Sequence, residues 1–367
     1  MILPHTYPAI LALMVLSMLC WGFWANTYKL TGKWRFELFY FDYALGVLLA
    51  ALVLAYTFGS MGIDLSSGPD GFSFWDDLMH AAKHQWLYGF LGGVVFNFAN
   101  MLLVAAIAVA GLTVAFPIGM GLAMVVGVGL NYLIKPAGHP AFLFGGCALL
   151  VGAVVVDAMA YRALGRLRHE KAARAGTAKS TRRRAPTKGI ALAVVSGLLM
   201  GTFLPLVEMG RQGDTGLGPY AICVVFAVGV FFSTLMFNLF FMNLPVEGEP
   251  VDIFDYLKGR AKQHLLGVLG GALWCTGAVA AFVAASANAD LAAPVAGVAS
   301  APSPIGPAVS YAMGQGATLI AAVCGIWIWR EFKGADYKVK SLTTLMFVLF
   351  AIGLTLVSVA PRYAIGQ

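Results

Sequence analysis

Uncharged polar side chains occur inside the most hydrophobic stretches of this 367-residue chain, where a polar group is costly unless it has a partner or a function. Asn97 and Asn100 are three residues apart, so both would lie on one face of a helix. Gln315 and Thr318 repeat that spacing later in the chain. Side-chain amides donate and accept hydrogen bonds, and without a net charge they suit a neutral solute. These side chains are therefore candidate ligands for a small neutral solute.

Aromatic side chains accompany these amides. Trp21 and Trp274 each offer a flat face for stacking, and Tyr311 precedes Gln315 by one helical turn. Planar, amide-rich solutes need both a stacking surface and hydrogen-bonding groups. The alternative is that the amides only bridge neighbouring helices, as they often do in membranes. The candidate substrate-binding residues are Trp21, Asn97, Asn100, Trp274, Thr276, Tyr311, Gln315 and Thr318.

Two carboxylates near the ends of hydrophobic stretches have basic neighbours in the sequence. Asp157 precedes Arg162 and Arg166, which predicts an ion pair at the membrane surface. Glu208 is close to Arg211, and an ion pair at the outer rim is one interpretation. The other interpretation is that Glu208 forms an outer gate or a protonatable group.

Asp42 is a third carboxylate within a hydrophobic stretch, and its possible partners in the adjoining loop are Lys29, Lys33 and Arg35. A carboxylate at such a place is costly if it has no role, so we expect it to serve structure or ion coupling. The candidates for proton coupling or gating are therefore Glu208 and Asp42.

No arrangement of residues predicts an enzyme. The chain has no Ser, His and Asp in a catalytic pattern, no paired carboxylates and no glycine-rich phosphate loop. Asp76, His80 and His84 recur at every fourth residue and could bind zinc on one helix face, but a polar face at the membrane surface is the preferred interpretation. We expect no catalytic residue, no cofactor and no metal.

The composition places all these residues in a membrane. Hydrophobic residues make up 60% of the chain and charged residues 11%, less than half the roughly 25% of soluble domains. A soluble protein could not bury so much apolar surface. Residues 60–84 predict a polar loop, and the Pro-rich 287–307 stretch predicts a loop or a re-entrant segment. Ten apolar runs predict transmembrane helices at 7–28, 38–59, 85–108, 112–133, 140–160, 188–208, 217–242, 263–286, 307–329 and 341–360.

The basic residues predict how these helices are oriented. With the central basic segment in the cytoplasm, 20 of the 24 Lys and Arg lie on that side and both termini lie outside. This bias explains the net charge of +7 better than a nucleic-acid partner does. We therefore expect a multi-pass protein of the plasma or inner membrane. Its expected partner is the lipid bilayer, and we expect no nucleic-acid partner.

The two halves of the chain contain similar segments. Residues 84–93 and 262–271 are identical at six of ten positions, at an offset of 178. This repeat predicts a first five-helix half at 1–160, a basic cytoplasmic linker at 161–187 and a second half at 188–367. Because five is an odd number, the halves would have opposite orientations, which is typical of secondary transporters.

Several short motifs point to a family. They are the aromatic residues around Gly22, the Phe-Asp-Tyr at 41–43, the segments at 48–51 and 56–59, and the Gly-Ile-Trp at 325–327 that leads to Glu331-Phe332. With these motifs and a 5+5 repeat, the sequence resembles the ureide permease family of the drug/metabolite transporter superfamily. The resemblance implies uptake of ureides and oxo derivatives of nitrogen heterocycles, such as allantoin and uracil, with protons. The linker lacks the phosphate-loop motif of some members, so ATP binding is not implied.

Together these observations predict an all-α membrane protein with ten transmembrane helices in two inverted five-helix repeats. It would be a secondary active transporter of small neutral nitrogen-rich solutes, coupled to protons and working by alternating access. The alternatives are a transporter of sugars or of other metabolites or drugs with the same fold, and a channel. The sequence predicts no oligomeric state.

Overall fold

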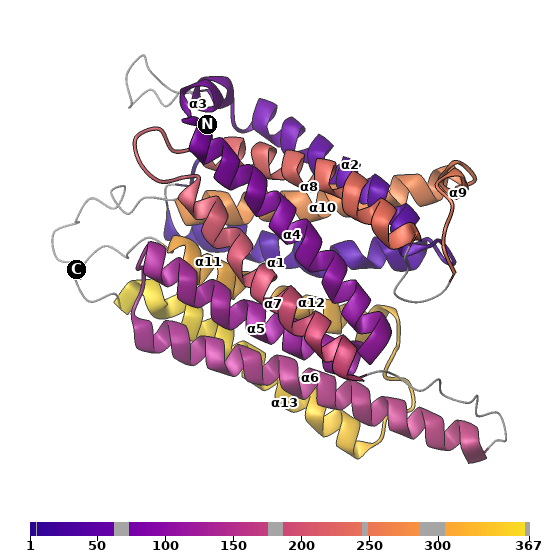
Figure 1. Ribbon diagram of the computed structural model, residues 1–367. Helices are drawn as coiled ribbons and strands as arrows, with labels where there is room; N and C mark the ends of the chain where they lie inside the picture. Colours follow the sequence, from indigo (N-terminus) through magenta and orange to yellow (C-terminus); the bar gives the residue numbers. More distant parts are fainter. Residues whose placement is uncertain (5, 62–72, 175–185, 244–248, 287–304, 364–367) are drawn as a thin grey trace.

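The computed structural model describes residues 1–4, 6–61, 73–174, 186–243, 249–286 and 305–363, which contain helices and no strand (Figure 1). Within these residues, ten helical segments are long and apolar enough to cross a membrane. The prediction of an all-α membrane protein with ten transmembrane helices is confirmed. The helices are α1 (Tyr7–Leu30), α2 (Phe36–Thr57), α3 (Phe74–His80), α4 (Lys83–Ala110), α5 (Leu112–Ile134), α6 (Pro140–Arg174), α7 (Pro186–Met209), α8 (Pro219–Asn243), α9 (Phe254–Leu257), α10 (Ala261–Ser286), α11 (Gly306–Gly314), α12 (Ala317–Val323) and α13 (Tyr337–Val359).

The fifth transmembrane helix is longer than expected. It does not end near residue 160 but continues as α6 to Arg174, into the segment expected to be linker. Residues 161–174 are mostly Ala, Leu, Arg, Lys and Glu, which favour a helix even in water. The rest of the expected linker at 175–185, and most of the Pro-rich 287–307 stretch, lie outside the described residues.

The expected loop at 60–84 contains the short helix α3. Ser73 caps its start, and Asp76 completes a capping box with Ser73. The helix ends at His80 and α4 begins at Lys83, so the helix face that was to hold Asp76, His80 and His84 is interrupted. Within the described residues, no group of three His, Cys, Asp or Glu side chains could hold a metal ion.

The ninth transmembrane segment is interrupted near its middle. The run predicted at 307–329 forms α11, then a break at Gln315 and Gly316, then α12 and a π-helical turn at Cys324–Ile328. Gly314 precedes the break and Gly316 is part of it, and glycine is a poor helix former. At the break the backbone N–H groups of Gln315 and Gly316 bond to carbonyls three residues back, so a tight turn replaces the regular helix pattern.

Polar contacts at the two ends of the bundle define two faces. At one end the Tyr7 hydroxyl of α1 donates a hydrogen bond to the backbone carbonyl of Ser358 in α13, and we call this end the terminal face. At the other end Lys171 of α6 donates to the carbonyl of Gly334 at 3.1 Å, and we call this end the linker face. Helix α1 begins at the terminal face, whereas α7 begins at the linker face (Figure 1).

The helix contacts recur when the two halves of the chain are exchanged. In chain order, the predicted repeat pairs α1 with α7, α2 with α8 and α4 with α10. If each helix is replaced by its repeat partner, the pair α4 and α7 corresponds to the pair α10 and α1, and both pairs pack against each other in the structure. The packing of α4 against α8 likewise becomes that of α10 against α2, and again both are present. This pattern supports the predicted inverted repeat.

Glycines at equivalent positions allow two of these matched contacts. A Cβ atom on Gly271 of α10 would lie 1.9 Å from the carbonyl oxygen of Tyr43 in α2. A Cβ atom on Gly93 of α4 would lie 2.1 Å from the carbonyl oxygen of Phe226 in α8. The two glycines are 178 residues apart, which is the offset of the repeat. Both interfaces therefore need a residue without a side chain, so that two helix backbones can touch.

We expect Gly271→Ala and Gly93→Ala each to lower the thermal unfolding temperature of the detergent-purified protein. The added methyl group forces two backbones apart, at a cost of about 1–3 kcal/mol. Gly129→Ala is the matched control, because no atom lies within 4 Å of a Cβ at that position. Helix propensity alone would make this control neutral or stabilising. Equal unfolding temperatures for Gly271→Ala and Gly129→Ala would contradict the close approach.

Candidate functional site

A cavity of about 290 Å³ lies inside the bundle, between helices from both ends of the chain. Its walls come from α1, α2, α4 and α5, and from α7, α10, α11 and α12. In α4 the lining residues extend from Phe96 to Ile107, three residues before the helix ends at the linker face. In α1 they extend from Trp21 to Ala25, also in the half nearer that face. The cavity therefore extends from the middle of the bundle towards the linker face.

A layer of aromatic rings forms the end of the cavity at the middle of the bundle. The rings of Trp21 and Trp274 stack with their centroids 6.0 Å apart, and the Trp21 indole N–H donates to the Trp274 carbonyl at 3.1 Å. Phe96 lies 4.5 Å from Trp274 between centroids, and Phe203 packs against Phe96 at 5.2 Å. This layer offers flat apolar surface to a planar solute and separates the cavity from the terminal face.

Two side-chain amides and a hydroxyl group are among the polar groups of the wall. The amide nitrogen of Asn100 donates to the Tyr40 hydroxyl at 2.9 Å, which holds the amide in place. Gln315 lies at the break between α11 and α12, and its side chain makes no hydrogen bond to another described residue. Thr318 follows in α12. The amide groups of Asn100 and Gln315 can donate hydrogen bonds to a solute and accept them from it. None of the side-chain donors and acceptors of Gln315 is bonded to another described residue, so all of them can bond a solute.

Among the residues that the structure describes, no Lys, Arg, His, Asp or Glu side chain lines this cavity. A charged solute would lose its hydration there without gaining an opposite charge, which is costly. The chemistry of the described wall therefore suits a neutral solute that has a flat face and hydrogen-bonding edges.

Six of the eight predicted substrate-binding residues line the cavity, and two do not. Asn97 is buried between α4 and α8, where its amide nitrogen donates to Ser233 at 2.8 Å and to Thr234 at 3.1 Å. Asn97 therefore bridges two neighbouring helices, which is the alternative stated for the amides in the sequence analysis. Thr276 donates to a backbone carbonyl of its own helix at 2.8 Å. The residues in the wall are Trp21, Asn100, Trp274, Tyr311, Gln315 and Thr318.

Much of the wall consists of residues that sequence reasoning did not select. An apolar side chain in an apolar helix has the same sequence signature whether it packs against a helix or lines a cavity. The aromatic residues around Gly22 were noted as a motif, and this signal could have identified Trp24. The lining residues missed are Trp24, Tyr43, Phe96, Phe116, Met120, Met200 and Phe203, with smaller aliphatic neighbours.

Glu208 belongs to a buried polar contact on the terminal side of the cavity. Its carboxylate accepts a hydrogen bond from Arg211 at 3.0 Å, and the two side chains are only 4% and 8% exposed. Arg211 also donates to the hydroxyl of Ser286 at the end of α10. The expected pair with Arg211 is present, but it is buried and ties α7 to α10 rather than lying at an exposed rim.

Asp42 has other partners than the expected loop residues. One carboxylate oxygen accepts a hydrogen bond from the Tyr256 hydroxyl at 2.5 Å, and the other lies 2.8 Å from Nδ1 of His264. Arg35, one of the expected partners, pairs instead with Glu37 at 2.8 Å. The side chain of Asp42 therefore faces α9 and α10 and joins them to α2 near the linker face.

Asp157 does not form the expected ion pair. No described Lys, Arg or His nitrogen lies within 4.0 Å of its carboxylate. Because α6 continues as a regular helix, Arg162 and Arg166 point away from Asp157 by about 140° and 180° around the helix axis. The prediction was wrong because it treated residues after 160 as a loop that could fold back.

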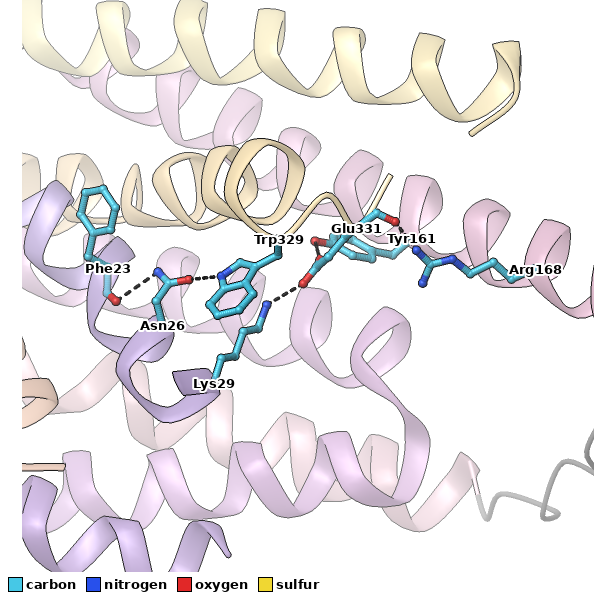
Figure 2. Close-up of polar contacts among 7 residues, drawn as sticks. All are labelled: Phe23, Asn26, Lys29, Tyr161, Arg168, Trp329 and Glu331. Carbon is cyan, nitrogen blue, oxygen red and sulfur yellow. Dashed lines mark hydrogen bonds and ion pairs between the residues drawn. The ribbon is translucent and has the colours of Figure 1, made fainter. Parts of the chain in front are cut away.

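Glu331 connects three segments at the linker face (Figure 2). Its carboxylate lies 2.5 Å from Nζ of Lys29 in α1 and accepts a hydrogen bond from the Tyr161 hydroxyl of α6 at 2.8 Å. Burial opposes ionisation, but these partners outweigh it and lower the pKa of Glu331. The Trp329 indole N–H also donates to Asn26 of α1 at 2.5 Å. These contacts hold α1, a wall of the cavity, against the segment that follows the interrupted ninth span.

The different surroundings of Asn97 and Gln315 give a direct test. We expect Asn97→Ala to lower the unfolding temperature, because it removes hydrogen bonds to Ser233 and Thr234 that are worth about 1–3 kcal/mol in a buried place. Gln315→Ala should unfold near the wild-type temperature, because its amide has no partner among the described residues. Thermal unfolding of both purified variants checks this. A Gln315→Ala protein as unstable as Asn97→Ala would contradict an open amide in the cavity.

Comparisons with known proteins agree with this architecture. Residues 39–188 match the family model described as ureide permease. Ureide permease 2 of Arabidopsis thaliana is 26% identical over 323 residues, which cover 71% of this chain and 79% of that protein. Ureide permease 1 of the same plant is 24% identical over 400 residues, which cover 93% of this chain and 94% of that protein. The resemblance to the ureide permease family is thereby confirmed.

A solved crystal structure shares the fold, with a TM-score of 0.51 at 14% identity, and the match covers 95% of this chain and 99% of that one. The curated relatives are named permeases, that is, transporters and not enzymes. Their names agree with the ten apolar helices of the bundle and with its internal cavity. The chain is therefore an integral, multi-pass membrane transporter and a relative of the ureide permeases.

Proposed function

We propose that the protein is a secondary active transporter that takes up small neutral nitrogen-rich heterocycles or ureides, of the allantoin and uracil class. The observation that carries the proposal is the central cavity, in which stacked tryptophans and amide groups meet with no charged side chain among the described lining residues. The ring faces of such solutes would lie on Trp21 and Trp274, and their N–H and C=O groups would bond Asn100 and Gln315. The names of the plant relatives support the same class of solute.

Alternating access is the proposed mechanism. The cavity extends towards the linker face, while the aromatic layer and the Glu208–Arg211 pair close its other side. We propose residues 1–160 and 188–367 as the two halves, with the linker at 161–187 in the cytoplasm because most basic residues lie at that face. The matched helix contacts support this mechanism, because exchange of the conformations of two inverted halves converts one open state into the other.

Transport by the protein in liposomes tests the proposal. We expect saturable uptake of labelled allantoin or uracil that an inward proton gradient accelerates. Asn100→Ala and Gln315→Ala should each raise the half-saturating concentration about tenfold, which corresponds to about 1.4 kcal/mol of lost binding. Thr276→Ala is the control, because this hydroxyl lies outside the cavity and should leave uptake unchanged.

Two results would overturn the proposal in different ways. Flux that neither saturates nor responds to the gradient would show a channel. Uptake of a sugar, with no uptake of allantoin or uracil, would show that the tryptophans stack on sugar rings and that the solute class is wrong.

For the proton we propose Asp42 as the coupling residue and Glu208 as part of the gate on the terminal side. The neighbour of Asp42 is His264, whose Nδ1 lies 2.8 Å from the carboxylate, so a proton can pass between the two side chains. Tyr256 is the other titratable group on this carboxylate. Glu208 instead accepts a hydrogen bond from Arg211, and no histidine is among its partners in the described residues.

We expect Asp42→Asn to abolish the acceleration of uptake by a proton gradient. Exchange of labelled for unlabelled solute should continue, because exchange needs no net proton movement. Glu208→Gln should lower the rate but keep the pH dependence, which makes it the matched control. The measurement is uptake and exchange across a series of internal and external pH values. Full gradient dependence in Asp42→Asn would exclude Asp42 as the coupling residue.

A further inference from the structure

A second cavity, of about 370 Å³, lies at the linker face between the extended part of α6 and the start of α13. Its apolar lining includes Met159 of α6 and Leu342 of α13. Its basic lining consists of Arg162 and Arg166, one helical turn apart on α6, and Lys338 at the start of α13. The cavity thus combines apolar side chains with three basic side chains, and two carboxylates complete its charged lining.

This arrangement lies where a membrane surface meets its hydrocarbon. A helix needs about 20 residues to cross the hydrocarbon, and the apolar runs at 140–160 and 341–360 have that length. Met159 and Leu342 are at the linker-face ends of these runs, so they border the hydrocarbon. Arg162, Arg166 and Lys338 lie just beyond the runs, at the depth of the lipid headgroups.

The three basic side chains are available to a ligand. All three are exposed, and none has a carboxylate oxygen within 4.0 Å among the described residues. Two carboxylates, Glu170 and Asp336, also line the cavity, and Asp336 accepts a hydrogen bond from the backbone of Val339 as the cap of α13. The cavity lining therefore has three positive and two negative side chains, and one of the negative ones, Asp336, already accepts a backbone hydrogen bond.

We propose that this cavity binds the headgroup of an anionic phospholipid from the leaflet at the linker face. The lipid phosphate lies between Arg162, Arg166 and Lys338. This position suits a phosphate because one guanidinium group can donate two parallel hydrogen bonds to two phosphate oxygens. The first acyl carbons pack on Met159 and Leu342, which gives a lipid an advantage over free phosphate. The bound lipid links α6 to α13, and the site is separate from the central cavity, so the inference does not depend on the transported solute.

The test uses the full chain purified in detergent. Native mass spectrometry counts retained lipids and thermal unfolding measures stability during titration with phosphatidylglycerol, phosphatidylcholine or inorganic phosphate. We expect retention and a higher unfolding temperature with phosphatidylglycerol only. Changing all three residues, Arg162→Gln, Arg166→Gln and Lys338→Gln, should weaken its binding about tenfold or more. These exposed positions leave the fold intact, which unfolding without added lipid verifies.

The control variant removes the same charge elsewhere on the linker face, by Lys33→Gln, Arg260→Gln and Lys262→Gln, three exposed residues outside the cavity. It should retain phosphatidylglycerol like the wild type. Equal loss in both triple variants would overturn the site, because attraction to the basic face as a whole would then suffice. Equal stabilisation by phosphate would show a small-anion site, and equal retention of phosphatidylcholine would show that the charges play no part.

Discussion

A polar group in the hydrocarbon of a bilayer has no water to bond, and this constraint explains the polar contacts inside the bundle. Asn97 bonds the hydroxyls of α8, and Glu208 pairs with Arg211. The side chain of Gln315 makes no such bond among the described residues, and it lies in the wall of the central cavity. An unpaired amide in a cavity wall is available to a solute, and this is why the proposed site is centred on Gln315.

The second requirement of the fold is contact between helix backbones. Gly93 and Gly271 bring their helices against carbonyl groups of α8 and α2 at equivalent positions of the two halves. These contacts leave no room for side chains, and both of them join the first half of the chain to the second. The break at Gln315 and Gly316 places a weak point of the ninth span beside the cavity. In the proposed mechanism, a change of access would act at these contacts between the two halves and at the interrupted helix beside the cavity.

Hydrophobicity predicted the ten helices, because the thickness of a bilayer sets their length. It could not predict where α6 ends, because beyond the membrane the length of a helix depends on the helix propensity of its residues. The expected ion pair of Asp157 was wrong for the same reason, since it required residues after 160 to form a loop. The polar part of the cavity wall was predictable because amides are rare in apolar helices. The aromatic part was not, since Phe96 and Phe203 have the sequence signature of packing residues. Asn97 and Asn100 differ by about 60° around one helix, and only the packing of that helix decides which faces the cavity.

The lack of charged side chains among the described residues of the central cavity has an electrical consequence. A membrane voltage acts only on charges that move through it, by about 2.3 kcal/mol per elementary charge per 100 mV. In the proposed mechanism, neither these described walls nor the neutral solute would carry charge across the field when the cavity changes sides. A current measured during uptake would then report the coupling ion alone, and the charge moved per solute molecule would equal the number of ions that accompany it.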